Sequence, residues 1–256
     1  MIIISNPTLA LPVALLTFLL PLFSTLPIVS SLPLRPRDVI ASGTKLRILP
    51  LGDSITYGYQ PSFEDGTNGY RYQLSQRLSG SDFLFVGTKR SGDMADNYNE
   101  GHSGYTISQI HNVMGPALDE RPNIILLHAG TNDVNTEASE PYSEMPDRLG
   151  SLIDSIFETC PDSVVLVAKI INSGDTDTEE RVKSFNNAVP GVVKQRADAG
   201  KKVMVVDQSV VGADELADGT HPTDEGYAHM ADVWFEGIKA AAEQSLISAP
   251  VGDDPS

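Results

Sequence analysis

Short, nearly continuous apolar runs alternate along the chain with longer stretches in which apolar residues recur every three or four positions. Runs rich in Val, Ile and Leu are typical of strands buried on both faces, and the longer stretches are typical of amphipathic helices. The predicted strands are Leu46–Leu51, Phe83–Val86, Ile124–His128, Val164–Ala168 and Val203–Val206. The predicted helices are, approximately, Tyr70–Leu78, Ile107–Met114, Tyr142–Thr159, Glu179–Ala197 and Asp224–Ser245. This alternation predicts an α/β fold, namely a three-layer α/β/α sandwich around a five-stranded parallel sheet.

The beginning of the chain has a different pattern. Leu9 to Val29 is almost wholly apolar and is followed by the small residues Ser30 and Ser31. This pattern is typical of a secretory signal peptide, although no Lys or Arg precedes the apolar run. An uncleaved membrane anchor is the alternative, and the prolines within the run argue against it. The expected segments are a signal peptide at residues 1–31, an exposed linker at 32–44, one globular domain at 45–247 and a disordered tail at 248–256.

The signal peptide predicts a secreted, extracellular protein, with no stable membrane association once the leader is removed. The formal net charge of −16, from 34 Asp and Glu against 18 Lys and Arg, repels nucleic acid phosphates, so no nucleic-acid partner is expected. Cys160 is the only cysteine, which excludes an intrachain disulfide. No metal-binding or phosphate-binding motif is present, so we expect no cofactor and no metal. We expect a monomer.

A serine and a histidine stand at positions from which they could act together. Ser54 follows the first predicted strand in the run Gly52-Asp53-Ser54-Ile55-Thr56, and Asn132 follows the third strand at almost the same offset. If the strands take the flavodoxin-like order 2-1-3-4-5, the carboxyl ends of the first and third strands flank the point where such sheets bind ligands. The long loop after Val206 gives His221 ample reach back to this crevice.

These residue types supply the groups that ester hydrolysis by a serine requires. His221 can take the proton of the Ser54 hydroxyl, and Asp218 can accept the other ring N–H and stabilise the imidazolium. The backbone N–H groups of Ser54 and Gly104 and the side-chain amide of Asn132 can donate to the oxyanion of a tetrahedral intermediate. The sequence around Ser54 lacks the Gly-x-Ser-x-Gly pattern, which argues against an ordinary α/β-hydrolase.

Together these motifs resemble the conserved blocks of the SGNH hydrolases, of the wider GDSL type. The matching segments are Gly52-Asp53-Ser54, Gly104, Gly130-Thr131-Asn132-Asp133 and Asp218-Gly219-Thr220-His221-Pro222. The resemblance runs from about Leu46 to the final predicted helix and implies the SGNH hydrolase fold. The residues that it implies for the site are Ser54, Gly104, Asn132 and His221, with Asp218 completing a triad.

A narrower resemblance is to carbohydrate esterase family three, whose characterised members are secreted acetylxylan esterases. The segments that carry it are residues 49–58, 68–71, 85–87 and 100–107. It implies removal of acetyl groups from xylan or a related plant polysaccharide through an acyl-serine intermediate, with the acetylated polysaccharide or oligosaccharide as partner. His102 and Tyr105 flank Gly104 and either line the acyl or sugar pocket or pack within their loop.

Two other functions stay open from the sequence. A lipid or aryl esterase of the same superfamily would have a wide apolar pocket and would hydrolyse esters of long acyl chains. A non-catalytic carbohydrate-binding protein would be expected to have lost Ser54, Asn132 or His221, and all three are present.

Overall fold

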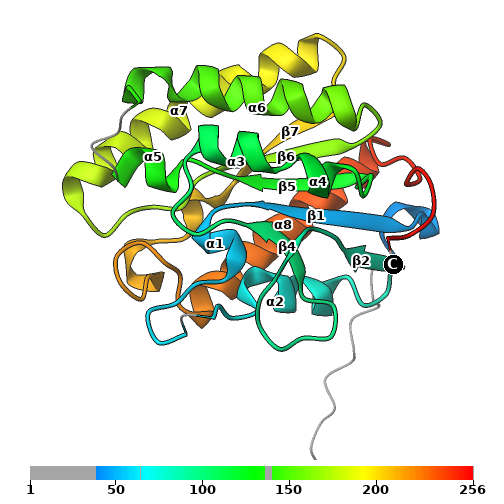
Figure 1. Cartoon of the computed structure of the whole chain (residues 1–256), viewed down its shortest axis with the longest axis horizontal. Coiled ribbons are helices and arrows are strands. Elements are labelled where there is room, and N and C mark those ends of the chain that lie inside the picture. The colour runs from blue at the N-terminus through cyan, green and yellow to red at the C-terminus, as the bar shows by residue number, and fades with distance from the viewer. Residues whose placement is uncertain (1–38, 64, 136–139, 256) are drawn as a thin grey trace, which may run out of the picture. The chain divides into compact units, whose positions relative to one another are not determined.

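The computed structural model describes residues 39–63, 65–135 and 140–255 (Figure 1). The predicted signal peptide and most of the predicted linker lie outside these ranges. The strands of the described part are β1 (Leu46–Gly52), β2 (Phe83–Phe85), β3 (Lys89–Arg90), β4 (Tyr98–Gly101), β5 (Ile124–His128), β6 (Val164–Lys169) and β7 (Val203–Asp207). The predicted α/β fold is confirmed, and all five predicted strands are present as β1, β2, β5, β6 and β7.

The sheet is larger than predicted, with seven strands in the order β3-β4-β1-β5-β6-β7 and β2 also paired with β1. β2 pairs in parallel with the first half of β1, and β4 pairs in parallel with its last two residues. The five predicted strands pair in parallel in the predicted order, β2-β1-β5-β6-β7. β3 pairs antiparallel with β4, so the sheet as a whole is mixed and has seven strands, where five wholly parallel strands were predicted. The two additional strands are short and polar, and therefore lack the apolar run on which the prediction relied.

The helices of the described part are α1 (Ser54–Tyr57), α2 (Gly69–Arg77), α3 (Ile107–Val113), α4 (Gly115–Leu118), α5 (Thr131–Asn135), α6 (Met145–Thr159), α7 (Thr176–Asp198) and α8 (Asp224–Glu243). Short 3-10 turns are η1 (Ile40–Gly43), η2 (Tyr142–Glu144), η3 (Gln208–Val210) and η4 (Ala213–Glu215). The five predicted helices correspond to α2, α3, α6, α7 and α8. The other three have only four or five residues, too few to show a helical period.

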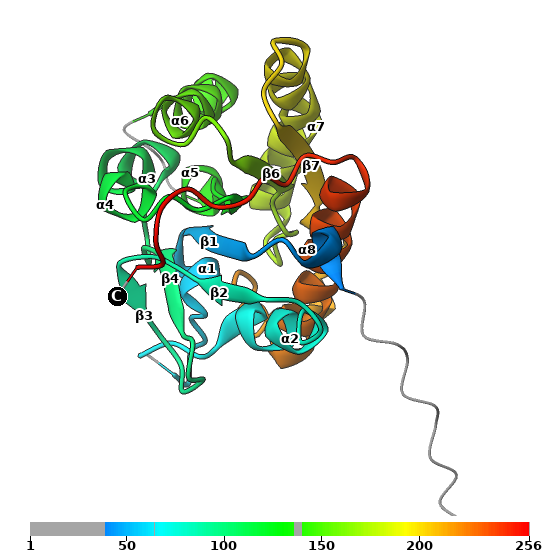
Figure 2. The ribbon, with the colours of Figure 1, turned by 90° about the vertical axis from the view of Figure 1, so that its right-hand side faces the viewer.

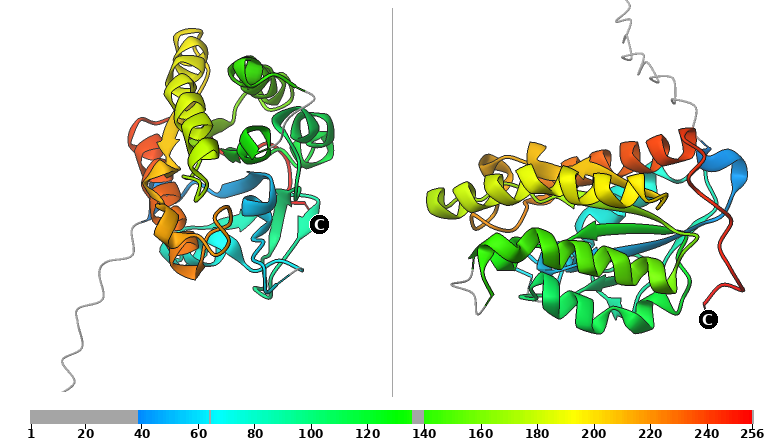
Figure 3. Two further views of the ribbon diagram at one scale, coloured as in Figure 1. Left: turned by 90° about the vertical axis from the view of Figure 1, so that its left-hand side faces the viewer. Right: turned by 90° about the horizontal axis from the view of Figure 1, so that it is seen from above.

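Helices cover both faces of the sheet (Figures 2 and 3). Side chains alternate along β5, where Ile125 and Leu127 join one buried cluster with the helices α3 to α7. Ile124 and Leu126 join a second buried cluster on the opposite face with α1, α2 and α8. This alternation follows from the two-residue period of a strand, and it explains why a strand buried on both faces reads as a continuous apolar run.

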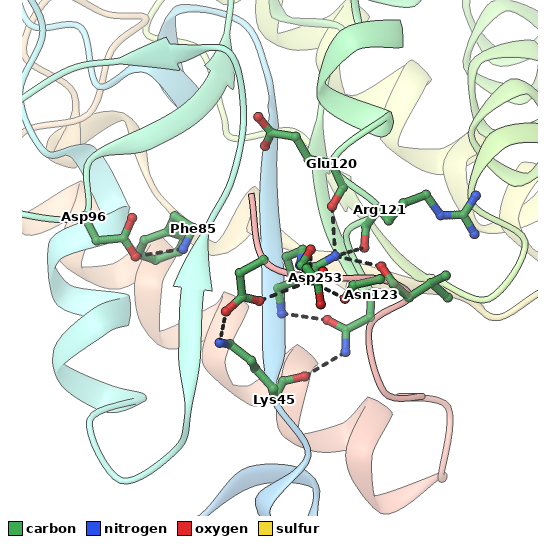
Figure 4. A network of polar contacts seen from close by, with 11 residues as sticks. Lys45, Phe85, Asp96, Glu120, Arg121, Asn123 and Asp253 are labelled. Atoms are coloured by element: carbon green, nitrogen blue, oxygen red, sulfur yellow. Dashed lines mark hydrogen bonds and ion pairs between the residues drawn. The ribbon is translucent and has the colours of Figure 1, made fainter. Parts of the chain in front are cut away.

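The last residues of the chain, predicted as a disordered tail, lie against the start of β1 in the structure (Figure 4). The guanidinium of buried Arg47 donates to the backbone carbonyls of Val251, Gly252 and Asp253 at 2.9–3.1 Å. Arg47 also contacts the carboxylate of Asp254 at 3.1 Å. A buried guanidinium requires acceptors, and the tail supplies most of them.

Within residues 39–63, 65–135 and 140–255, no helix combines the length and the apolar composition needed to span a bilayer.

Candidate active site

Ser54 stands at the turn from β1 into α1, at the edge of the sheet where α5 follows β5 (Figure 1). Asp53 caps α1, because its Oδ1 accepts the backbone N–H of Ile55 at 2.9 Å. A side chain at Gly52 would collide with the backbone carbonyl of His128 on β5, so only glycine allows β1 and β5 to lie this close. The serine is 6% exposed, and the turn holds its side chain at the carboxyl end of β1.

The structure brings Ser54, His221 and Asp218 together. Oγ of Ser54 lies 2.9 Å from Nε2 of His221, and Nδ1 of His221 lies 2.8 Å from Oδ2 of Asp218. A carboxylate can only accept at Nδ1, so Nδ1 carries the hydrogen and Nε2 is left to accept from the serine hydroxyl. The structure thus places side by side three residues that the sequence analysis named, although Ser54 and Asp218 are 164 positions apart.

The loop that carries Asp218 and His221 holds both residues through local bonds. Oδ1 of Asp218 accepts the backbone N–H groups of Thr220 and His221 at 3.0 and 2.8 Å. The backbone N–H of Ala217 donates to the carbonyl of His221 at 2.7 Å. Partial burial alone would raise the pKa of Asp218, but the hydrogen bonds from His221 and Thr220 outweigh it and lower that pKa. Asp218 is therefore held as a carboxylate.

An aromatic side chain that the sequence reasoning missed lies against the histidine. The ring of Tyr59 packs on the ring of His221, with centroids 4.4 Å apart and planes at 57°. The backbone carbonyl of Tyr59 accepts the hydroxyl of buried Tyr227 at 2.8 Å, which ties this segment to α8. The only sequence signal is the position of Tyr59 five residues after Ser54, and that position does not by itself predict a contact with His221.

Asn132 is hydrogen-bonded to Tyr105, the residue that directly follows Gly104. The side-chain amide of Asn132, in α5, donates to the backbone carbonyl of Tyr105 at 2.9 Å. Gly104 has φ of +81°, a left-handed conformation that favours glycine, and it forms the turn before Tyr105. The backbone N–H of His102 donates to the carbonyl of Gly52 at 2.9 Å, so this loop is bonded to the end of β1, two residues before Ser54.

His102 and Tyr105 stack on each other, with ring centroids 5.0 Å apart and planes at 25°. Nε2 of His102 also lies 2.6 Å from Oε1 of Glu100, whose side chain is 1% exposed. The other carboxylate oxygen accepts the backbone N–H and the hydroxyl of Thr88 at 2.7 and 2.8 Å. Burial alone would raise the pKa of Glu100, but the bonds from His102 and Thr88 outweigh it and lower that pKa.

Sequence reasoning missed Glu100, which lies on β4 two residues before His102, the residue that follows the end of this strand. It also missed the role of Asp133, the neighbour of Asn132. Oδ2 of Asp133 accepts the backbone N–H of Ile107 at 2.9 Å, and Oδ1 lies 3.0 Å from the guanidinium of Arg148. These bonds fix α5 to α3 and α6 and thereby set the position of Asn132.

The described residues contain no group of three or more His, Cys, Asp or Glu side chains arranged to hold a metal ion. Cys160 is buried and its thiol donates to the carbonyl of Leu118 at 3.3 Å. Burial raises the pKa of that thiol, as expected of a structural cysteine.

Comparison with known proteins decides the family. Residues 51–229, which include all four motifs, match the GDSL-like Lipase/Acylhydrolase family. The chain belongs to this family. The resemblance to SGNH and GDSL ester hydrolases that the motifs predicted is thereby confirmed.

The proteins to which this GDSL family member is similar include carbohydrate esterases. The chain is 32% identical to a multidomain esterase of Ruminococcus flavefaciens over 250 residues, which span 84% of this chain and 31% of that protein. A family 3 carbohydrate esterase of Clostridium thermocellum has a similar structure, with a TM-score of 0.65 and 30% identity over 80% of this chain and all of that one. A family 3 carbohydrate esterase of Talaromyces cellulolyticus gives a TM-score of 0.64 and 26% identity, over 78% of this chain and 99% of that one.

Proposed function

We propose that this GDSL family member is a serine carboxylic ester hydrolase that removes acetyl groups from xylan or a related plant polysaccharide. The observation that carries the proposal is the chain of contacts at 2.9 and 2.8 Å from Ser54 through His221 to Asp218. Support for a carbohydrate ester comes from the similarity, at 30% and 26% identity, to two family 3 carbohydrate esterases.

In the proposed mechanism Ser54 attacks the acetyl carbonyl carbon while its hydroxyl proton passes to Nε2 of His221. The tetrahedral intermediate then collapses, the bond from the acetyl carbon to the sugar oxygen breaks, and His221 returns the proton to that oxygen. Water attacks the acetyl-Ser54 ester and gives its proton to His221. Collapse of the second intermediate releases acetate and restores the serine hydroxyl. Asp218 keeps the ring oriented and stabilises the imidazolium in both halves.

The oxyanion of each intermediate needs preorganised donors. We assign this role to the backbone N–H groups of Ser54 and Gly104 and to the side-chain amide of Asn132. The bonds from Asn132 to Tyr105 and from His102 to Gly52 support the assignment, because they fix the Gly104 loop, α5 and the end of β1 to one another. In well-studied hydrolases one such donor contributes about 3–4 kcal/mol to stabilisation of the transition state.

We also propose that the protein is secreted, with residues 1–31 as its signal peptide. The apolar run followed by small residues before a polar segment supports this proposal. N-terminal sequencing of the protein recovered from the medium of a eukaryotic and a bacterial secretion host would test it, with a mature N-terminus near Ser31 expected. Retention of the intact leader in the membrane fraction would contradict it.

The function is tested by measuring acetate release from acetylated xylan together with hydrolysis of aryl esters of increasing acyl length. We expect the mature chain to release acetate and to prefer acetyl over longer acyl groups. Ser54→Ala is expected to abolish both activities, whereas the matched Ser79→Ala, at an exposed serine just after the end of α2, is expected to leave them unchanged. A preference for long acyl esters would support a lipase, and activity without Ser54 would exclude the proposed mechanism.

A further inference from the structure

An exposed phenylalanine lies among three hollows beside the candidate active site. Phe63 is 57% exposed, the largest exposed fraction among the Phe, Tyr and Trp side chains that the structure describes. It lines all three hollows, which have volumes of about 340, 460 and 320 Å³. Each volume falls within the range of about 300–1,000 Å³ that is common for small-molecule sites.

One of the hollows reaches the loop that carries the histidine, and a second shares Gln60 and Asp224 with it. The side-chain amide of Gln60 lines two of them and donates to the carbonyl of Pro222, the residue after His221, at 3.1 Å. The same amide contacts the carboxylate of Asp224 at 3.0 Å. Ala217, the neighbour of Asp218, lines the third hollow. Tyr59 packs on the ring of His221 and is followed directly by Gln60, so the segment that lines these hollows also contacts the histidine.

The surfaces around Phe63 are mixed rather than apolar. Tyr72, 45% exposed on α2, gives the first hollow a second aromatic wall, while Gln73 and Asn68 supply amide groups there. A pyranose ring has one face of C–H groups and a rim of hydroxyls, so it can pack flat on an aromatic ring while amides and carboxylates bond to the rim.

An acyl chain fits these hollows poorly. Burying apolar methylene groups against the exposed amide of Gln73 would remove water from it without offering hydrogen bonds in return. Acidic residues also line the hollows, with Asp65 and Asp93 against a single Arg90 in one and Asp224 in the other two. Together with the overall charge of −16 they disfavour an anionic polysaccharide.

We propose that these hollows bind the backbone of a neutral polysaccharide, with Phe63 as the ring on which a sugar residue stacks. The inference rests on the proposed function. It places the sugar part of the ester substrate next to Tyr59 and Gln60. Neither Phe63 nor its neighbours contact the reacting atoms in this assignment. Phe63 is therefore a residue of substrate binding, and its loss is expected to affect polymeric substrates alone.

Binding without chemistry gives the direct test. Calorimetric titration of Ser54→Ala with unsubstituted xylan oligosaccharides is expected to show saturable binding. Adding Phe63→Ala is expected to weaken that binding roughly tenfold, equivalent to about 1.4 kcal/mol. Phe63→Tyr, which keeps the ring, is expected to restore it. The matched control is Tyr142→Ala, which removes an exposed ring that lies under Arg181 in the helix layer on the opposite face of the sheet.

Kinetics separate this inference from the proposed function. In the active chain, Phe63→Ala is expected to lower kcat/KM on acetylated xylan through KM and to leave hydrolysis of an aryl acetate unchanged. Two results would overturn the sugar site while leaving the ester hydrolase intact. One is equal oligosaccharide binding by Ser54→Ala and by Ser54→Ala combined with Phe63→Ala. The other is an equal loss of kcat/KM on acetylated xylan and on the aryl acetate. Aryl acetate hydrolysis that does not depend on Ser54 would instead overturn the proposed function.

Discussion

Asp218 holds His221 with both of its carboxylate oxygens, one at 2.8 Å from Nδ1 of the ring and the other at 2.8 Å from the backbone N–H of the same residue. The carboxylate therefore fixes both the ring tautomer and the path of the loop. Because Ser54 approaches Nε2 at 2.9 Å, the orientation of the serine hydroxyl depends on this pair.

Asp218→Asn separates the two functions of the carboxylate. The amide oxygen can still accept from the backbone, so the loop keeps its shape, but the charge that stabilises the imidazolium is lost and the tautomer is no longer fixed. We expect kcat for an aryl acetate to fall by roughly 10³- to 10⁴-fold with little change in thermal stability. The matched Asp214→Asn, at an exposed position of the preceding turn, is expected to retain full activity. Near-normal activity in Asp218→Asn would contradict the proposed triad.

Gly104 offers a test of the oxyanion donors through the backbone alone. An added methyl group would meet open space, but φ of +81° is strained for any residue with a Cβ. Gly104→Ala is expected to cost about 1–2 kcal/mol if the conformation is kept, or to displace the N–H group if it relaxes. In either case we expect kcat to fall more than KM rises. Gly115→Ala, which also meets open space but has no positive φ, serves as control.

Glu100 makes stability depend on pH. Its folded pKa lies below the ordinary value of 4.5, so its contribution is fully present above that value and is lost as the pH falls through the lower, folded pKa. Urea unfolding from pH 7 to pH 3 is therefore expected to show a steeper loss of unfolding free energy for the native chain than for Glu100→Gln. Glu158→Gln, at an exposed position, is expected to parallel the native chain. Parallel curves for the native chain and Glu100→Gln would contradict this account.

The contacts of Arg47 predict that the tail contributes to stability. Removing residues 249–256 leaves a guanidinium that is 1% exposed without three backbone acceptors. We expect a loss of about 2–4 kcal/mol in the free energy of unfolding, measured with urea. Asp254→Ala, which removes only a solvent-exposed carboxylate, is expected to cost far less. A truncated chain as stable as the native one would show that the tail contacts contribute nothing.

The sequence alone determined the elements and residues whose constraints are local. β1, β5 and β6 carry continuous apolar runs, because they are buried on both faces. A turn from strand to helix needs glycine and a capping side chain, as in Gly52-Asp53-Ser54. Asp218 and His221 lie three residues apart, so their pairing was also within reach of local reasoning. The family follows from these motifs.

Only the tertiary structure decided the contacts between residues that are distant in the sequence or that lie in polar segments. β3 and β4 have no apolar run, because β3 is exposed and the buried residues of β4 are Asn99, Glu100 and Gly101. Tyr59 meets His221, and Arg47 meets the tail, across more than 160 residues. Such contacts leave no periodic signal, because the folded path of the chain, and not the spacing along it, brings their partners together.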